Sequence, residues 1–179
     1  MTGREKLLDP TGFDERAGDN TLAPRPAGLR GLTVGLLDNT KPNAGMLLSE
    51  IAGELRRRQD IGESRMYTKG YFGTPMEETM LKQIAQECDL VVTAVGDCGS
   101  CSAATVADGI LLERAGIPTV SVVSDSFLAS GRAMAQVQGF SGYEFVAVKH
   151  PVASLDAARL RDRVQAVLPE VLRILGVES

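Results

Sequence analysis

The chain has no tryptophan, a single histidine and only three cysteines among its 179 residues. Three cysteines are too few for the disulfide framework of a small secreted domain, and one histidine with one C-x-x-C pair cannot complete a structural zinc site within one chain. Three tyrosines and five phenylalanines leave few rings that could stack on a flavin or a nucleotide. We therefore expect no metal and no tightly bound organic cofactor.

Long apolar runs and an excess of positive charge are absent as well. No run of about 18 apolar residues could span a bilayer, and the first residues lack the apolar core of a secretory signal. The formal net charge of −4 gives no electrostatic reason to bind nucleic acid or an anionic membrane. These absences predict a cytoplasmic protein that acts on a small molecule, with no nucleic acid and no membrane as a partner.

What the sequence does contain is an alternation of strand and helix patterns. Strands are predicted at 32–37, 63–68, 89–96, 118–124 and 144–149, and helices at 44–59, 75–87, 102–115, 127–138 and 154–175. Thr74 as N-cap and Pro75 at the first helical position place the start of the second helix, and Ser154 opens the last one. The pattern predicts an α/β fold with a three-layer, doubly wound sheet of about five parallel strands, similar to flavodoxin-like and Rossmann-like folds.

The first 31 residues differ from the rest in composition. They are polar and rich in glycine and proline, and they show neither the helix-like nor the strand-like spacing of apolar residues. We therefore expect an extended N-terminal arm at 1–31, which lies across the domain or a partner subunit, and a single α/β domain at 32–179.

Two cysteines stand close together in the segment Gly-Asp-Cys-Gly-Ser-Cys at 96–101, where a predicted strand turns into a helix. A thiol at a helix N-terminus faces unpaired N–H groups and the positive end of the helix dipole, which lower its pKa and favour the reactive thiolate. We expect Cys98 to be the attacking thiol and Cys101 the resolving one. The alternative is two small core residues, but a polar, glycine-rich turn is unlike a packed interior. Cys88, which precedes a strand, is interpreted as structural.

In a sheet of this kind, ligands bind beyond the carboxyl ends of the strands, so the residues that follow each strand are candidates for a common pocket. His150 follows the last strand and could deprotonate a thiol or hold an anion. Lys41 has no capping role in its loop, and we expect it to bind a substrate carboxylate and to favour the Cys98 thiolate. The other candidates for substrate binding are Asp38, Asn39, Thr40, Asn43, Asp97, Gly99, Ser100, Asp125 and Ser126.

For several of these polar residues a local role is the alternative, because Asp, Asn, Ser and Thr also cap helices and turns. For Asp125 and Ser126 in particular, helix capping and pocket lining remain equally open. Asp108 is interpreted as an ordinary polar position of its helix.

The segment Cys98-Gly99-Ser100-Cys101 resembles the motif of a family of small proteins named after the sequence U-G-S-C, where U is selenocysteine. The similarity spans most of the chain, through LDPTG at 8–12, GLLDNTKPN at 35–43, Gly96-Asp97, Asp108, ERAGIPT at 113–119, Phe127 and His150-Pro151. The resemblance implies that Cys98 stands where the family has its selenocysteine nucleophile. More distantly, the chain is similar to the selenoprotein B subunits of glycine and betaine reductases.

Three functions are compatible with these observations. The leading one is an enzyme that uses Cys98 and Cys101 in thiol-based redox or nucleophilic chemistry on a small anionic substrate, with a thiol reductant as partner. The second is a lyase, hydratase or isomerase in which the cysteines move protons or add to an activated substrate. The third is a subunit that acts only with a paralogous chain, and the arm favours such a homo- or hetero-oligomer.

Overall fold

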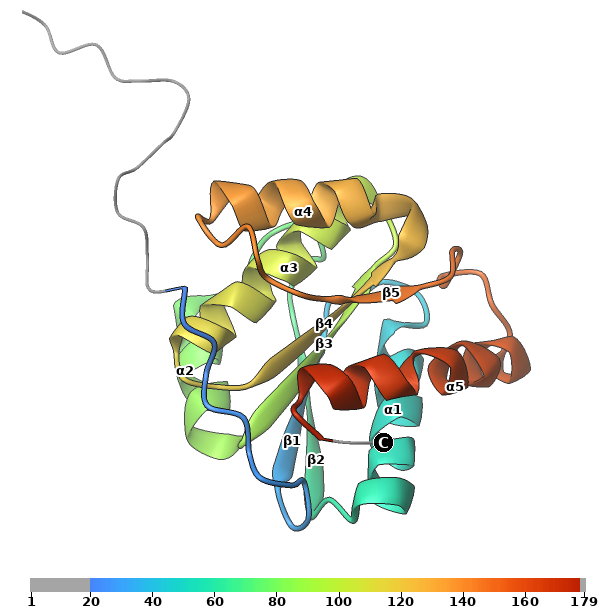
Figure 1. Ribbon diagram of the computed structural model, residues 1–179. Helices are drawn as coiled ribbons and strands as arrows, with labels where there is room; N and C mark the ends of the chain where they lie inside the picture. The colour runs from blue at the N-terminus through green and yellow to red at the C-terminus, as the bar shows by residue number, and fades with distance from the viewer. Residues whose placement is uncertain (1–19, 178–179) are drawn as a thin grey trace, which may run out of the picture.

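The computed structural model describes residues 20–177. Strands and helices alternate in the order β1 (Thr33–Asp38), α1 (Ala44–Gln59), β2 (Glu63–Thr68), α2 (Glu78–Glu87), β3 (Leu90–Gly96), α3 (Gly99–Arg114), β4 (Thr119–Ser124), α4 (Leu128–Val137), β5 (Val146–Val148) and α5 (Ala157–Ile174), with a 3₁₀ turn at Asp125–Phe127 before α4. Figure 1 shows one sheet with helices on both of its faces. The predicted three-layer α/β fold is confirmed.

The sheet has the strand order β2-β1-β3-β4-β5, and every neighbouring pair is parallel. This order reverses between β1 and β3, so the loops after these two strands leave the sheet on opposite faces. α1 and α5 pack on one face, while α2, α3 and α4 cover the other. The candidate cysteines follow β3 and therefore lie at the switch point, where ligands bind in folds of this kind.

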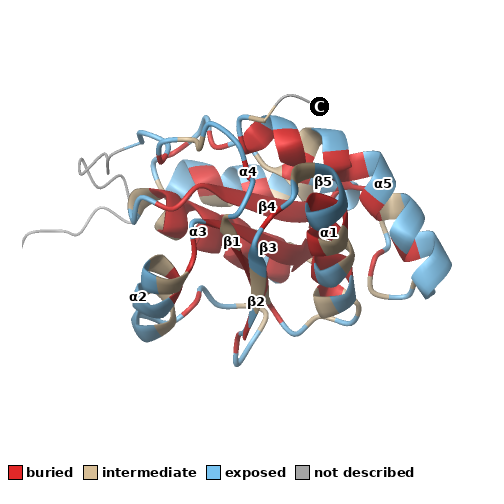
Figure 2. Ribbon diagram, turned by 90° about the horizontal axis from the view of Figure 1, so that it is seen from below, coloured by how far each residue is buried: buried red, intermediate tan, exposed pale blue. Residues whose placement is uncertain are grey.

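The core is built around the central strand. All seven residues of β3 are buried, as expected for a parallel strand covered on both faces. On one face, leucines and valines of α1 and α5 form the largest hydrophobic cluster with β1, β3 and β4. Two smaller clusters lie beneath α2 and α4, and Figure 2 shows the buried residues concentrated along the sheet and the inner sides of the helices.

Several predicted element boundaries were wrong. α2 begins at Glu78 and not at Pro75, since the Met76 N–H donates to Asp108 of α3 (2.6 Å) and keeps 74–77 extended. α5 begins at Ala157, because Asp156 caps it by accepting from the Arg159 N–H (2.9 Å). The strand predicted at 144–149 is reduced to the three residues of β5.

Asp108 is not the ordinary polar position that the sequence suggested. Its side chain is fully buried and forms an ion pair with Lys69, which follows β2 and is itself only 3% exposed (Nζ to Oδ2, 2.5 Å). Burial raises the pKa of the Asp108 carboxyl, and the adjacent lysine acts in the opposite direction. The pair fixes the loop between β2 and α2 against the middle of α3.

The part of the N-terminal arm that the structure describes packs against the end of α3 that is remote from the cysteines. Glu113, buried near the end of α3, forms an ion pair with Arg25 (2.8 Å) and accepts the N–H groups of Ala23 (2.7 Å) and Thr119 (2.8 Å). One carboxylate thus joins the arm, α3 and β4. Residues 1–19 of the predicted arm lie outside the described residues.

The buried Lys69–Asp108 pair predicts a large effect on stability when one charge is removed. Lys69→Met leaves a buried carboxylate without its cation and should lower the free energy of unfolding by about 3–5 kcal/mol. The double variant Lys69→Met/Asp108→Asn removes both charges and should recover part of the loss. Urea denaturation followed by circular dichroism measures both, and a Lys69→Met loss no larger than that of the exposed control Lys82→Met would contradict the assignment.

Candidate active site

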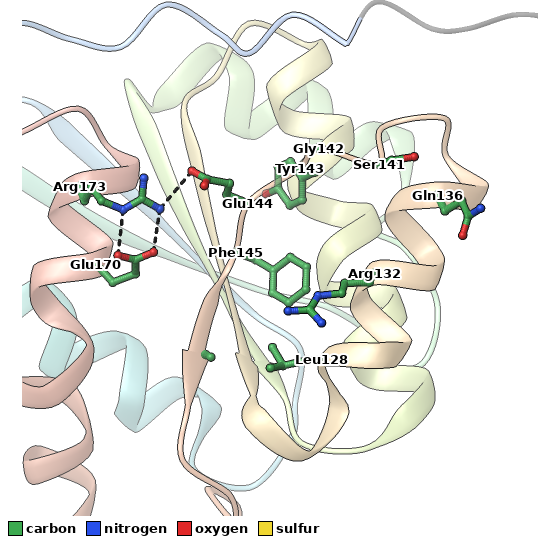
Figure 3. A pocket seen from close by; sticks show the side chains of 11 residues that line it. Leu128, Arg132, Gln136, Ser141, Gly142, Tyr143, Glu144, Phe145, Glu170 and Arg173 are labelled. Carbon is green, nitrogen blue, oxygen red and sulfur yellow. Dashed lines mark hydrogen bonds and ion pairs between the residues drawn. The ribbon is translucent and has the colours of Figure 1, made fainter.

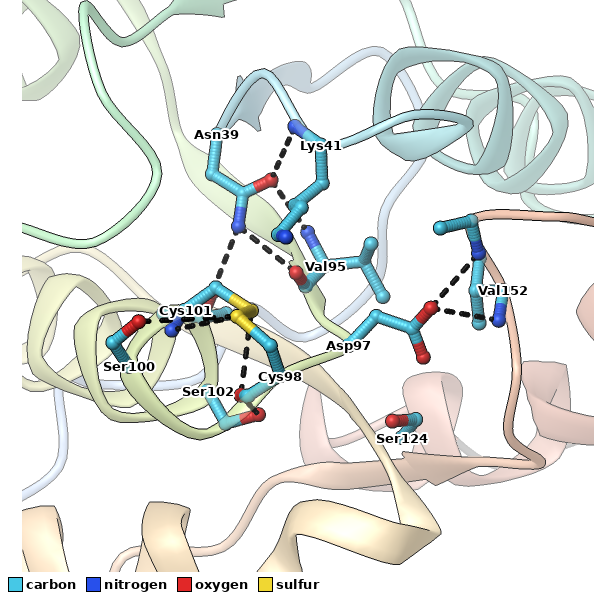
Figure 4. The surroundings of a disulfide bond; sticks show 12 residues. Asn39, Lys41, Val95, Asp97, Cys98, Ser100, Cys101, Ser102, Ser124 and Val152 are labelled. Carbon is cyan, nitrogen blue, oxygen red and sulfur yellow. Dashed lines mark hydrogen bonds between the residues drawn. A yellow bond between two sulfur atoms is a disulfide. The ribbon is translucent and has the colours of Figure 1, made fainter.

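The two cysteines of the C-x-x-C segment form a disulfide bond at the N-terminus of α3, with their Cα atoms 5.4 Å apart. α3 begins at Gly99, three residues earlier than predicted, because Cys98 is its N-cap and accepts the Cys101 N–H (3.4 Å). Cys101 is fully buried, whereas Cys98 is partly exposed at the carboxyl edge of the sheet. Figure 4 shows both sulfur atoms and the polar residues around them.

The turn that carries Cys98 is held closely against the helix. The hydroxyl and the N–H of Ser102 both donate to the Cys98 carbonyl (2.6 and 3.0 Å). A Cβ at position 96 would lie 2.7 Å from the Ser102 Cα, so only glycine fits where β3 turns into α3. Backbone packing therefore sets the position of the Cys98 side chain.

Asp97 was predicted to bind substrate, but its carboxylate is buried and binds other groups of the protein. Its side chain is 3% exposed, and its Oδ1 lies 2.9 Å from Nδ1 of His150. Its Oδ2 accepts the N–H groups of Val152 (3.0 Å) and Ala153 (2.9 Å). Asp97 thus holds the loop after β5 against the cysteine turn, and it brings His150 next to that turn.

His150 is fixed by further neighbours from β4 and its loop. Nδ1 also lies 3.3 Å from the hydroxyl of Ser124, the buried last residue of β4. The His150 N–H donates to Asp125 (3.0 Å), and this hydrogen bond lowers the pKa of the Asp125 carboxyl. The ring of Phe127 packs edge-on against the imidazole, with centroids 5.5 Å apart. Asp125 therefore orients the histidine backbone, while Ser126 is exposed beside it.

Two asparagines of the loop after β1 hold neighbouring segments in place. Asn39 is fully buried; its side chain accepts the Val95 N–H (3.1 Å) and donates to the Val95 carbonyl (2.9 Å), on the strand that leads to Cys98. Asn43 has a positive φ of 68° and donates to the carbonyls of Val152 (2.9 Å) and Leu155 (2.8 Å). Both amides are engaged by backbone, which makes them positioning residues of the pocket wall in this structure.

The remaining predicted residues lie around the same edge. The Asp38 carboxylate accepts the Thr40 N–H (2.7 Å), and the Thr40 hydroxyl donates to the Asn39 carbonyl (2.6 Å). Gly99 opens α3, and the exposed Ser100 has its hydroxyl 3.9 Å from the Cys98 sulfur. Lys41 lies in the surroundings of the disulfide (Figure 4), with Nζ 4.2 Å from the centre of the Phe72 ring.

Sequence reasoning missed two neighbours of the site. Ser124 gave no signal, since a serine at the end of an apolar strand also fits the strand itself. Phe72 lies in the loop between β2 and α2, four residues after the strand predicted at 63–68, and this place in the loop was its only signal.

A cavity of about 660 Å³ lies elsewhere, between α4, β5 and α5 (Figure 3). Its walls include Arg132, Phe145 and Arg173, and Arg173 is already paired with Glu144 (3.0 Å) and Glu170 (2.7 Å). None of the predicted site residues lines it. The cysteines remain the candidate site, because they lie beside a pair formed by the buried Asp97 carboxylate and the partly exposed His150 imidazole.

Within residues 20–177, no helix is both long and apolar enough to cross a membrane. No group of three or more His, Cys, Asp or Glu side chains comes together in that range so that it could hold a metal ion.

Fold and site together describe a doubly wound α/β protein with a C-x-x-C disulfide at the switch point of its sheet. The sequence model of the UGSC family matches residues 6–177, nearly the whole chain, and the chain therefore belongs to the UGSC family. No curated protein matches the chain significantly. The more distant similarity to reductase subunits stays a prediction.

The third cysteine provides an internal reference for reactivity. Burial raises the pKa of the Cys88 thiol, which lies 3.3 Å from the Tyr67 hydroxyl. A raised pKa means less thiolate at any pH near neutrality, so after reduction Cys88 should react with iodoacetamide more slowly than Cys98. Mass spectrometry of each cysteine-containing peptide over time measures both rates, and equal rates at the two positions would contradict the assignment of Cys98 as the reactive thiol.

Proposed function

We propose that this protein is a thiol-dependent oxidoreductase in which Cys98 attacks a small substrate and Cys101 resolves the adduct. The observation that carries the proposal is the disulfide between a partly exposed N-cap cysteine and a fully buried one in the first turn of α3. The attacking thiol must be accessible to the substrate, and Cys98 is partly exposed. The resolving thiol must lie close to the attacking sulfur, and Cys101 is bonded to it.

The proposed reaction balances as a two-electron reduction. The Cys98 thiolate attacks one atom of a reducible bond in the substrate, such as S–S or O–O, and the other atom leaves with the electron pair. The Cys101 thiolate then attacks the Cys98 sulfur, so that the first fragment also leaves with an electron pair and the disulfide forms. A dithiol reductant restores both thiols by exchange with this disulfide and is itself oxidised.

The Asp97–His150 pair supports a role for His150 in moving protons. A carboxylate oxygen accepts from Nδ1, so this nitrogen carries the proton and Nε2 keeps its lone pair. Such a histidine can take the proton of the Cys98 thiol and return it to the leaving group. Because the Asp97 carboxylate is buried, it also stabilises the imidazolium that forms in between.

A second candidate function is a lyase, hydratase or isomerase without net electron transfer. The same Asp97–His150 pair favours it, because an acid–base group beside a thiol needs no oxidant or reductant. Turnover under fully reducing conditions, with solvent deuterium entering the product, would assign the site to this second function.

Cysteine variants test the redox proposal directly. With hydroxyethyl disulfide as the oxidant, reduced wild type should form only the Cys98–Cys101 disulfide. Cys101→Ser should retain a stable mercaptoethanol adduct on Cys98, and Cys98→Ser should form no adduct there and react slowly. Non-reducing mass spectrometry distinguishes these products. A wild type that never forms the disulfide, with Cys98 no more reactive than Cys88, would refute the proposal.

Replacement of the acid–base pair should lower the rate without removing the thiols. His150→Gln should slow reduction of hydroxyethyl disulfide by excess dithiol about hundredfold at neutral pH, the lower range for loss of a general acid–base group. Asp97→Asn puts an NH₂ group where the carboxylate accepted three hydrogen bonds and should also slow the reaction, as well as shift its pH profile. Asp162→Asn, on the exposed side of α5, is the matched control and should react at the wild-type rate.

A further inference from the structure

Two aromatic rings lie uncovered at the carboxyl edge of the sheet, in the loop between β2 and α2. Tyr71 is 55% exposed and Phe72 is partly exposed, and their ring centroids are 4.5 Å apart. Neither ring contributes to the three hydrophobic clusters of the core. Stability alone therefore does not account for two adjacent aromatic residues at this position.

The side chain of Lys41 lies over one of these rings. Its Nζ lies 4.2 Å from the centre of the Phe72 ring, an attractive cation–π arrangement, and its N–H donates to the buried Asn39 side chain (3.2 Å). Within residues 20–177, no carboxylate lies at ion-pair distance from this Nζ. The lysine is thus held over the ring with its charge available to an anion.

The loop that carries the aromatic rings is anchored at both ends. Lys69 pairs with Asp108 through its side chain and donates its N–H to the Asp38 carbonyl (2.9 Å). At the other end, the Met76 N–H donates to the same Asp108 carboxylate. Both ends of the segment 70–75 are therefore held at one carboxylate of α3, and the rings have a defined place at the edge.

The strand order brings this loop to the side of the cysteine. β1 lies between β2 and β3, so the loops after the three strands follow one another across the edge. The ends of β2 and β3 are separated by two strand spacings, roughly 10 Å, and Lys41 follows the strand between them. The loops that carry Phe72, Lys41 and Cys98 therefore leave three neighbouring strands at the same edge of the sheet.

We propose that Lys41, Phe72 and Tyr71 form the specificity wall of the site, and that the substrate is a small carboxylic acid with a planar, unsaturated or aromatic group. The carboxylate would pair with Lys41, the planar group would pack on Phe72 and Tyr71, and the reducible bond would face Cys98. This inference rests on the proposed attack by Cys98 and adds the class of molecule that is attacked.

Three disulfide reagents and one alkylating agent separate the contributions. Dithiobis-nitrobenzoate is aromatic and anionic, dithiodipyridine is aromatic and uncharged, and hydroxyethyl disulfide is neither. Iodoacetamide reports the reactivity of the thiolate alone. In each disulfide reaction the Cys98 sulfur bonds to one sulfur of the reagent, the other leaves as a thiolate, and Cys101 releases the second. All proteins are fully reduced before the reaction. The rate of each variant is divided by the wild-type rate with the same reagent, which removes the intrinsic differences in reactivity between the reagents.

Loss of the Phe72 ring should lower the reaction rates of the two aromatic reagents. Phe72→Ala should lower their rates about fivefold, as expected for loss of one aromatic contact, and change the other two rates less than twofold. Phe72→Tyr should restore them. Lys41→Met should slow dithiobis-nitrobenzoate more than dithiodipyridine, because any loss of thiolate is common to both reagents. Val137→Ala, an exposed apolar position on α4, and Lys82→Met are the matched controls and should leave all rates unchanged.

The outcomes distinguish this inference from the proposed function beneath it. If Cys98 reacts rapidly but Phe72→Ala lowers all four rates alike or none, the aromatic wall is refuted and the redox function stands. If Lys41→Met slows both aromatic reagents equally, the carboxylate assignment is refuted. If Cys98 of the wild type reacts no faster than Cys88 with any reagent, the proposed function fails and the inference with it.

Discussion

The carboxylate of Asp97 is the contact on which the arrangement of the candidate site depends. It accepts from His150, Val152 and Ala153 while its own residue directly precedes Cys98. Without it, the loop after β5 would have two unpaired N–H groups, and His150 would lose its fixed ring orientation. Burial makes these charge-assisted hydrogen bonds strong and makes their loss costly. One side chain therefore couples the turn that carries Cys98 to the imidazole of His150.

The position of the site could be predicted from the sequence, because it follows from topology. Alternating strands and helices imply a parallel sheet, and the carboxyl ends of its strands share an edge. That rule predicted that Cys98, Asp97 and His150 lie at one edge, although they are up to 53 residues apart in the sequence. The prediction required no knowledge of side-chain contacts. In the structure the Asp97 carboxylate contacts His150, and Asp97 directly precedes Cys98 in the chain.

The roles of individual polar residues could not be predicted in the same way. Asn39 and Asp97 are polar loop residues in the sequence, but both are buried and bound to backbone groups of other segments. Whether a carboxylate faces solvent or closes a loop depends on partners more than 50 residues away, which periodicity does not encode. The start of α2 was misplaced for the same reason, since Asp108 captures the Met76 N–H and keeps the Thr74-Pro75 segment out of the helix.

α3 connects these separate contacts because it is a rigid, almost wholly buried helix with polar groups along its length. Cys98 and Cys101 stand at its start, the Thr105 hydroxyl contacts Asn39 (3.4 Å), and Asp108 anchors the aromatic loop. Glu113, near the other end, binds the N-terminal arm. Each contact fixes one surrounding segment relative to α3, and α3 therefore sets the positions of these segments relative to the two cysteines. A change in the anchored loop leaves two other contacts of α3 in place, at Thr105 and at Glu113, so the helix that positions the sulfur atoms keeps supports of its own.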